Sequence, residues 1–338
     1  MKPFHELTHR GQARRLRPHA ARLLDSFGIS PARLRQLTAA TNVVFRVDCA
    51  DGRRLVLRMT SPKSAHSAEN VRSEIAWIRA LARESEIGVP EPIPAPDGEY
   101  VRTLQAPDIP GAWHCALFMW VPGAMLDERL TLENVSRHGR LAATLHEHGR
   151  TFAPPEGFRI RRYRSLFPYA DPSVPNPEPI VLFDRCPPEL MPPARLAVFR
   201  EAHDRIQAEI DRLFEEAPPQ VIHNDLHAWN VKVCRRRLYA LDFEDLLLGH
   251  PAQDLATTLY YYHYRENYEG ILDAFRAGYE TVRAWPEQRA GQLEALIAGR
   301  GILLANFVVA SPDAEERAIA PEYLRRIEER LRAFLAGQ

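Results

Sequence analysis

Lysine is nearly absent from this sequence. Of its 44 lysine and arginine residues only three are lysines, Lys2, Lys63 and Lys232. The 44 aspartate and glutamate residues balance these cations, so the formal net charge is zero. A neutral chain has no global attraction to nucleic acid or to an anionic membrane, and neither partner is expected.

Cysteine is also scarce, and long apolar runs are missing. The four cysteines, Cys49, Cys115, Cys186 and Cys234, are far apart and form no C-x-x-C pair. This spacing predicts reduced thiols in a cytosol and argues against a disulfide framework. We find neither a run of about 18 apolar residues nor the apolar core of a signal peptide, so a cytoplasmic location without a membrane span is expected.

The composition is that of a globular protein, with 45% hydrophobic and 26% charged residues in 338 positions. This length allows a substantial core in one or two domains. Residues 151–193 contain eleven of the 28 prolines, which argues against a long regular element there. The segment is either a flap over an acceptor site or a passive connector.

Hydrophobic periodicity predicts strands and helices in the first third of the chain and mainly helices afterwards. Alternation over 42–49, the Asp51-Gly52 turn and a return strand over 54–59 predict a hairpin, and two further strands are expected at 98–104 and 115–121. Helical spacing of apolar residues predicts these helices: 8–27, 68–83, 130–149, 194–216 and most of the chain after 256.

Polar residues are concentrated between Val221 and Ala256, at the ends of short apolar runs. His223, Asp225 and Asn230 match H-x-D-x-x-x-x-N, and Asp242-Phe243 matches the start of D-F-G. Phosphoryl transfer needs a carboxylate for the attacking hydroxyl, with an amide and a second carboxylate for magnesium. The pattern predicts Asp225 as the catalytic base and Asn230 and Asp242 as magnesium ligands.

The fuller form, H-x-D-x-H-x-x-N followed by D-F-x-x-x-x-x-G-x-x-x-x-D-L-A, resembles the aminoglycoside phosphotransferase and choline kinase superfamily. Within it, Asp242 to Asp245, Gly249 and Asp254 to Ala256 look most like the branch of type II homoserine kinases and the bacterial stress-response kinase. The resemblance implies an α+β, two-lobed protein-kinase-like fold. A small N-terminal nucleotide-binding lobe (1–121) with an antiparallel sheet would precede a larger, mainly helical lobe (122–338).

The resemblance also implies roles in the first lobe. Arg58, in LVLRM, stands where kinases place the phosphate-pairing lysine, and Glu74 resembles its helix partner. The expected phosphate loop, 38–42, has no glycine, so backbone N–H groups and hydroxyls would hold phosphate there. Asn42 matches a loop asparagine of relatives, whereas Thr41 is equally well an ordinary turn residue.

Other positions keep more than one interpretation. The run Phe118 to Gly123 resembles the interlobe hinge, where the backbone of Met119 and Val121 would meet adenine, although such a run also suits plain core. Glu244 or Asp245 could reach a second magnesium ion or could be solvated.

Several further positions are expected to support the loop and the acceptor pocket. His223 is interpreted as a brace, and His227 either touches substrate or phosphate or shapes the loop. Asp254 is expected to begin a helix and to accept hydrogen bonds from the catalytic-loop backbone. His146 is interpreted as structural. Rings among 260–264, with Arg300 and Asn306 on a late helix, could line or close the pocket.

The predicted function is transfer of the γ-phosphoryl group of ATP, with Mg²⁺, to a hydroxyl of a small molecule. An amino alcohol, a homoserine-like metabolite, a sugar or an aminoglycoside-like compound would suit the branch. A protein serine/threonine kinase is an alternative. The glycine-free loop and Arg58 motivate a nucleotide-binding pseudokinase. A zinc hydrolase using His223, Asp225 and His227 would leave Asn230 and Asp242 unexplained.

Overall fold

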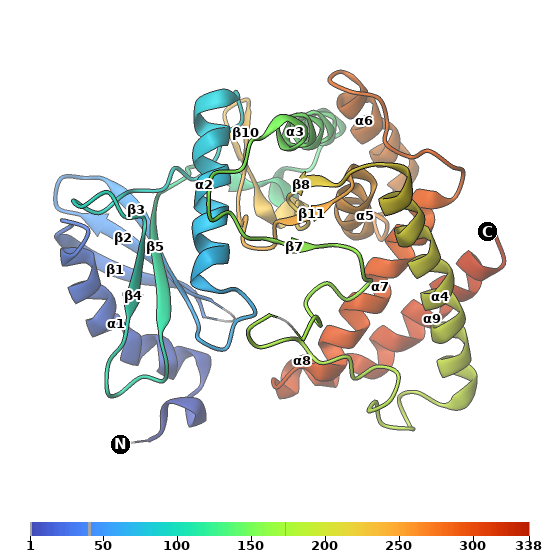
Figure 1. The fold of residues 1–338 in the computed structure, drawn as a ribbon, viewed down its shortest axis with the longest axis horizontal. Helices are drawn as coiled ribbons and strands as arrows, with labels where there is room; N and C mark the ends of the chain where they lie inside the picture. The colour runs from blue at the N-terminus through green and yellow to red at the C-terminus, as the bar shows by residue number, and fades with distance from the viewer. Residues whose placement is uncertain (1, 40–41, 173, 338) are drawn as a thin grey trace. The chain divides into compact units, whose positions relative to one another are not determined.

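The computed structural model describes residues 2–39, 42–172 and 174–337. The chain divides into two compact units, drawn in Figure 1. The N-terminal unit consists of Met1–Gly123, Phe152–Arg159 and Cys234–Glu244. The C-terminal unit consists of Ala124–Thr151, Ile160–Val233 and Asp245–Gln338.

A five-stranded antiparallel sheet forms the centre of the N-terminal unit, with the order β1-β2-β3-β5-β4. Its strands are β1 (Pro31–Ala39), β2 (Asn42–Cys49), β3 (Arg54–Thr60), β4 (Val101–Leu104) and β5 (Trp113–Met119). The β2–β3 hairpin confirms the predicted pairing, and Gly52 adopts φ +84° in its turn, a conformation open to glycine. A short 3₁₀ helix, η1 (Phe4–Glu6), precedes the sheet, and β10 (Arg237–Ala240) bridges in parallel to Gly88 through Tyr239.

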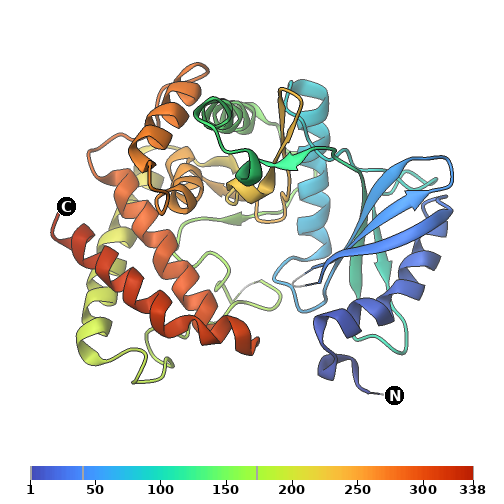
Figure 2. The same ribbon diagram turned by 180° about the vertical axis from the view of Figure 1, so that it is seen from behind.

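Two helices cover the two faces of this sheet. On alternate positions of β2 and β3, side chains such as Phe45 and Leu57 pack with Leu16 of α1 (His9–Asp25) in one core. The side chains between them point to the other face, where Arg58 meets α2 (Ala68–Glu84). Figures 1 and 2 show α1 and α2 on opposite sides of the sheet. The period of two along each strand therefore separates the packing face from the face that carries Arg58.

The expected phosphate loop is shorter than predicted. Thr38 and Ala39 end β1 and Asn42 begins β2, so these three positions belong to strands. Irregular pairing between Pro31 and Arg33 and between Gln36 and Thr38 breaks the alternation of β1, which hides this strand in the sequence. Thr41 lies outside the described residues.

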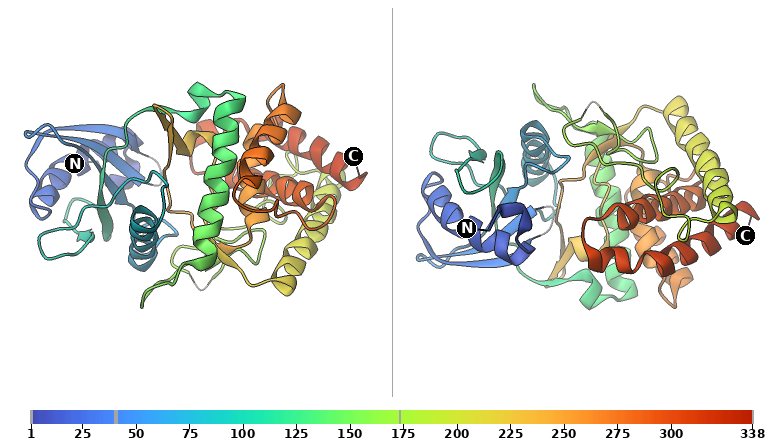
Figure 3. Two further views of the ribbon diagram at one scale, coloured as in Figure 1. Left: turned by 90° about the horizontal axis from the view of Figure 1, so that it is seen from above. Right: turned by 90° about the horizontal axis from the view of Figure 1, so that it is seen from below.

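The C-terminal unit is mainly helical. Its helices are α3 (Leu132–Thr151), α4 (Pro193–Glu216), α5 (Pro251–Tyr262), α6 (Tyr268–Glu280), α7 (Gln292–Ala310), α8 (Ala314–Ala318) and α9 (Ala320–Leu335). Gly139 and Gly278 allow α3 and α6 to pack closely, because a Cβ at either position would meet a backbone oxygen within 2 Å (Figure 3).

Short strands complete this unit. β6 (Ala124–Met125) pairs antiparallel with β9 (Val231–Cys234), and β7 (Arg161–Arg162), β11 (Leu247–Gly249) and β8 (Gln220–Ile222) form a second small sheet. The 3₁₀ helices are η2 (Leu126–Arg129) and η3 (Ala228–Asn230). Among the described residues of 152–192, β7 is the one regular element, which confirms the prediction for the proline-rich segment.

Helix α7 is the one helix among the described residues that is long and apolar enough to cross a membrane by length and composition. It has 19 residues, and its most apolar 18-residue window has a mean hydropathy of 1.7. In the structure 67% of its most apolar window is buried within the protein. Burial of that extent is the environment of a core helix, and Figure 2 shows α9 beside it.

Candidate active site

The predicted catalytic loop, residues 223–230, lies in the C-terminal unit between β8 and β9. Asp254, in the first turn of α5, accepts hydrogen bonds from the backbone N–H groups of His223 (3.1 Å) and Asn224 (2.6 Å). Asn224 adopts φ +65°, a region that asparagine tolerates better than most residues. One carboxylate thus fixes the start of the loop, and the predicted structural role of Asp254 is confirmed.

A buried chain of hydrogen bonds holds Asp254 in turn. His146 Nε2 lies 2.9 Å from Asp254 Oδ2, and His146 Nδ1 lies 2.9 Å from the hydroxyl of Tyr279. Burial acts to raise the pKa of Asp254, but the contacts from His146, His223 and the Asn224 backbone outweigh burial and lower it. The carboxylate therefore stays charged, and His146 has the structural role expected of it.

Three side chains surround the carboxylate of Asp225. Asn230 Nδ2 donates to Oδ2 at 2.8 Å and also to the backbone oxygen of Asp225 at 3.0 Å. His227 Nε2 lies 3.4 Å from Oδ2, and Arg300 Nη2 donates to Oδ1 at 2.8 Å. Both carboxylate oxygens are engaged, which fixes the direction in which Asp225 points.

Arg300 is the residue that the sequence interpretation did not connect with Asp225. Its side chain is 9% exposed, it comes from the middle of α7, and it also donates to the hydroxyl of Tyr261 at 3.3 Å. Burial lowers the pKa of Arg300, but Tyr261 and Asp225 outweigh burial and raise it above its ordinary value. The signal that could have singled it out is that Arg300 is the one arginine in a mainly apolar helix.

Beside the loop, an aromatic cavity of about 500 Å³ opens within the C-terminal unit. Trp229 and four tyrosines line it together with Arg265 and Arg326, and its lining contains no carboxylate. Tyr261 connects the cavity to the loop, since its ring packs 4.6 Å from that of His227. The cavity therefore adjoins the residues that hold Asp225.

The two acidic residues after Asp242 have separate partners. Asp245, in the C-terminal unit, accepts a 2.6 Å hydrogen bond from Tyr169, whose pKa is raised well above its usual value by burial and by that carboxylate. Glu244, in the N-terminal unit, accepts a hydrogen bond from the side chain of Asn42. Neither carboxylate is simply solvated, which corrects that alternative.

The predicted pair of Arg58 and Glu74 forms in the N-terminal unit. Arg58 Nη1 donates to Glu74 Oε1 at 2.7 Å and Nη2 donates to Oε2, with side chains 9% and 3% exposed. Burial lowers the pKa of Arg58, whereas the charges of Glu74, Glu244 and Asp242 outweigh it and raise it. Asp242, at φ +58°, thus belongs to the unit that carries the guanidinium expected to bind phosphate.

At the expected hinge, one backbone group of Met119 already has a protein partner. Met119 is the last residue of β5, and its N–H donates to the backbone oxygen of Glu91 at 2.8 Å. That N–H therefore already has a protein acceptor, so a contact of Met119 with adenine would use its backbone carbonyl, and its role stays a prediction. Val121 is buried, and its role stays a prediction.

The described residues contain no group of three or more histidine, cysteine, aspartate or glutamate side chains placed to hold a metal ion. Such a group is what the zinc alternative requires. His227 instead lies against Asp225 and against the rings of Trp229 and Tyr261.

Comparison with known families places this loop in context. The model of the phosphotransferase enzyme family matches residues 33–290. The chain belongs to this family. The match confirms the resemblance to the aminoglycoside phosphotransferase and choline kinase superfamily, and it identifies the chain as a phosphotransferase enzyme.

Solved structures of similar fold span almost the whole chain. A microcompartment-associated aminopropanol kinase is 24% identical, with TM-score 0.79 over 95% of this chain and 98% of that chain. An amicoumacin kinase in complex with AMP-PNP, Ca²⁺ and Ami is 17% identical, with TM-score 0.72 over 94% and 92%. A spectinomycin phosphotransferase in complex with ADP and spectinomycin is 14% identical, with TM-score 0.58 over 94% and 98%. These similarities confirm the predicted kinase-like fold.

No curated protein sequence matches the chain.

Proposed function

We propose that the protein transfers the γ-phosphoryl group of ATP to a hydroxyl of a small molecule, with Asp225 as the catalytic base. The observation that carries this proposal is the fixed carboxylate of Asp225, held on both oxygens by Asn230 and Arg300. A carboxylate in one orientation can align an incoming hydroxyl and accept its proton. His223 and Asp254 support it by fixing the loop.

Nucleotide binding is supported by the N-terminal unit. Arg58 would hold the phosphates, with Glu74 fixing its direction, as in the kinase lysine–glutamate pair. The buried Nε of Arg58 has no hydrogen-bond partner among the described residues, so the guanidinium keeps a donor for an anionic group. Asn42 and Thr41 would contribute to the phosphate site, and Val121 to the adenine site. The structures with AMP-PNP and with ADP bound are consistent with ATP as the donor.

Asn230 and Asp242 would hold magnesium on the nucleotide. Magnesium prefers oxygen ligands from one or two side chains together with phosphate oxygens. Asn230 uses its Nδ2 to bind Asp225, which leaves its amide oxygen as a ligand, and Asp242 supplies a carboxylate. Glu244 is a further candidate ligand. When bound, the ion would neutralise charge that develops on the transferred group.

The aromatic cavity supports a small acceptor of neutral or negative charge. Its volume of about 500 Å³ lies within the range of small-molecule sites. A polycationic aminoglycoside would meet Arg265 and Arg326 and no carboxylate in the lining. Of the four predicted acceptor classes, a sugar or a homoserine-like metabolite therefore fits best.

The proposal is tested by incubating the protein with γ-labelled ATP, Mg²⁺ and a panel of hydroxyl compounds, with Asp225→Asn as the matched control. The panel contains sugars, hydroxy amino acids, amino alcohols and aminoglycosides, and a protein substrate mixture is added as a separate arm. We expect labelled product from a sugar or a hydroxy amino acid with the wild type. Nucleotide binding without transfer to any acceptor would contradict the proposal and favour a pseudokinase.

A cytosolic location is part of the same proposal. All four cysteines are free in the structure, two of them buried. Free thiols at these positions are consistent with a reducing compartment, where ATP and small metabolites are present.

A further inference from the structure

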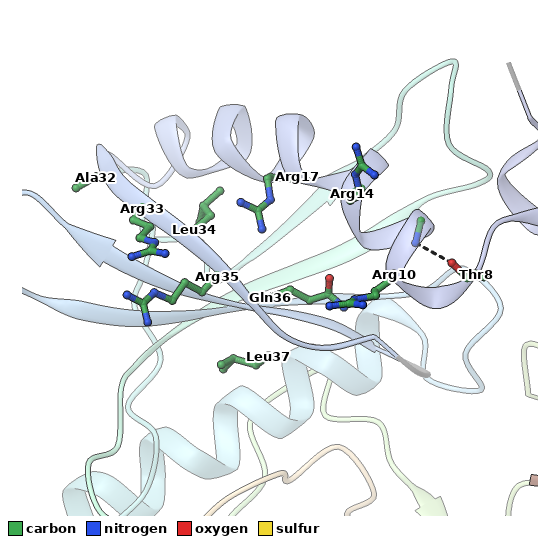
Figure 4. A pocket seen from close by; sticks show the side chains of 11 residues that line it. Thr8, Arg10, Arg14, Arg17, Ala32, Arg33, Leu34, Arg35, Gln36 and Leu37 are labelled. Atoms are coloured by element: carbon green, nitrogen blue, oxygen red, sulfur yellow. Dashed lines mark hydrogen bonds between the residues drawn. The ribbon is translucent and has the colours of Figure 1, made fainter. Parts of the chain in front are cut away.

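A groove of about 1050 Å³ lies between α1 and β1 in the N-terminal unit, and its lining includes none of the residues assigned to phosphoryl transfer. Five arginines line it: Arg10, Arg14 and Arg17 from α1, and Arg33 and Arg35 from β1. Figure 4 shows these side chains gathered along the space between the helix and the strand. The lining contains no acidic and no aromatic side chain.

The spacing of the arginines gathers their charge on one surface. Positions 10, 14 and 17 are three and four residues apart, so they share one face of α1. Positions 33 and 35 are two apart, so they share one face of β1. Among the described residues, one carboxylate forms an ion pair with this set, Asp48 with Arg35 at 3.7 Å. This excess of positive charge is local to the groove, because the chain as a whole has no net charge.

The groove also follows an unpaired strand edge. β1 is at the end of the strand order, with β2 as its one neighbour in the sheet. Six consecutive residues, Ala32–Leu37, line the groove. Because successive side chains alternate between faces, a lining of consecutive residues means that the groove runs along the backbone edge itself. Such an edge presents backbone N–H and C=O groups that can pair with another strand.

We propose that this groove binds an extended acidic segment of a partner protein, which adds to β1 as a further strand. Carboxylates on alternate residues of an extended segment recur about every 7 Å, the same interval that separates Arg33 from Arg35 along β1. The arginines would repel the β1 edge of a second copy, so the edge selects against self-association. Single-stranded nucleic acid is disfavoured, because no aromatic side chain is present for its bases to stack on.

The first test measures binding of a fluorescein-labelled ten-residue peptide, with alternating aspartate and valine, to the full-length protein by anisotropy. We expect binding that weakens as salt rises, because the contacts are exposed charges. Arg14→Gln with Arg33→Gln should weaken binding about tenfold. The matched control, Arg205→Gln with Arg276→Gln, changes two exposed arginines of the C-terminal unit and should bind as the wild type. Equal binding by both double variants overturns the proposal.

The second test separates strand addition from attraction between charges. Two versions of the peptide carry N-methyl groups on either the odd or the even residues, so both keep every carboxylate. Strand addition uses the N–H groups of one set, and we expect one version to lose at least about tenfold in affinity while the other binds normally. Equal affinity of the two versions overturns the proposal. The proposal is also overturned if oligothymidylate or inorganic polyphosphate of equal charge binds as tightly as the peptide.

Discussion

Arg300 donates a hydrogen bond to Oδ1 of Asp225 at 2.8 Å, opposite the bond that Asn230 donates to Oδ2. The arginine comes from α7, 75 residues after the aspartate in sequence. A helix of the core therefore determines the orientation of the catalytic-loop carboxylate. Because Tyr261 bonds Arg300 and also lines the aromatic cavity, the same contact connects Asp225, the proposed base, to the cavity proposed for the acceptor.

Changing Arg300 should impair turnover and leave nucleotide binding intact. Arg300→Lys keeps the charge but loses the planar guanidinium whose Nη2 donates to both Asp225 and Tyr261. Misplacement of a reacting group by about 1 Å costs up to about 100-fold in rate, so we expect kcat to fall by about 10- to 100-fold. The KM for ATP should stay within about twofold of wild type. Steady-state kinetics in both substrates, with thermal unfolding as the folding control, decides between positioning and general destabilisation.

Asp225→Asn should abolish most of the phosphoryl transfer without weakening the binding of ATP. The amide keeps the shape of the side chain and, with its oxygen toward Arg300, that hydrogen bond, but its NH₂ group cannot accept from Asn230 and it cannot take the proton of the acceptor. Positioned acid–base groups contribute about 10²- to 10⁴-fold, so turnover should fall by that factor. Nucleotide titration alongside acceptor phosphorylation checks this. Transfer at nearly the wild-type rate, or an equal loss of ATP affinity, would refute the role assigned to Asp225.

Arg58 should act through the phosphates. Arg58→Ala removes a charge aimed at phosphate, so the affinity for Mg–ATP should fall far more than the affinity for adenosine. Both affinities can be measured by calorimetry. Arg58→Lys should restore part of the loss, because the charge returns without the bidentate fork. The buried Glu74 would lose its partner in Arg58→Ala, a change that costs about 3–5 kcal/mol, so the double variant Arg58→Met/Glu74→Leu serves as the control for stability. An equal fall in the affinities for Mg–ATP and adenosine would show that Arg58 only supports the fold and does not bind phosphate.

Asp242 should be needed for the response to magnesium. Asp242→Ala removes a carboxylate ligand, so turnover should lose its stimulation by Mg²⁺ while the protein remains folded. The measurement is transfer rate against magnesium concentration, with Asp245→Asn as the comparison, because Asp245 instead bonds Tyr169. Normal magnesium-dependent transfer by Asp242→Ala would remove this residue from the site.

Local patterns predicted much of the fold and of the loop. The β2–β3 hairpin follows from alternation and an Asp-Gly turn, and the Arg58–Glu74 pair follows from strand and helix positions carried over from the resemblance. The role of Asp254 was also predictable from the resemblance, because its family counterpart begins a helix and accepts hydrogen bonds from the loop backbone. Each of these depends on near neighbours or on a motif with fixed spacing.

What the sequence did not predict depends on tertiary contacts. No spacing rule connects Arg300 with Asp225, since their contact requires α7 to pack against the loop. The hydrogen bond of the Met119 N–H to Glu91 likewise depends on a loop crossing beside β5. β1 was missed because its exposed arginines and irregular pairing remove the alternation that marks a half-buried strand.

Acid should destabilise the protein through His138. Burial lowers the pKa of this fully buried histidine from 6.5 to about 3. Above pH 6.5 the ring is neutral in the folded and unfolded chains alike. As the pH falls below 6.5, the unfolded chain takes up a proton that the folded chain does not, so stability is lost. The free energy of unfolding should drop by about 2 kcal/mol between pH 7 and pH 5 from this residue.

Urea unfolding of the wild type and of His138→Gln at pH 7, 6 and 5 measures this contribution. Glutamine can still bond the hydroxyl of Tyr262, which lies 2.9 Å from His138 Nδ1, but it does not titrate. The variant should therefore lose less stability on acidification, whatever its stability at pH 7. His250 and His263, whose pKa values burial lowers to about 4, act in the same direction and remain in both proteins. The exposed His5→Gln serves as the matched control, and a pH dependence of His138→Gln equal to that of wild type would contradict the assignment.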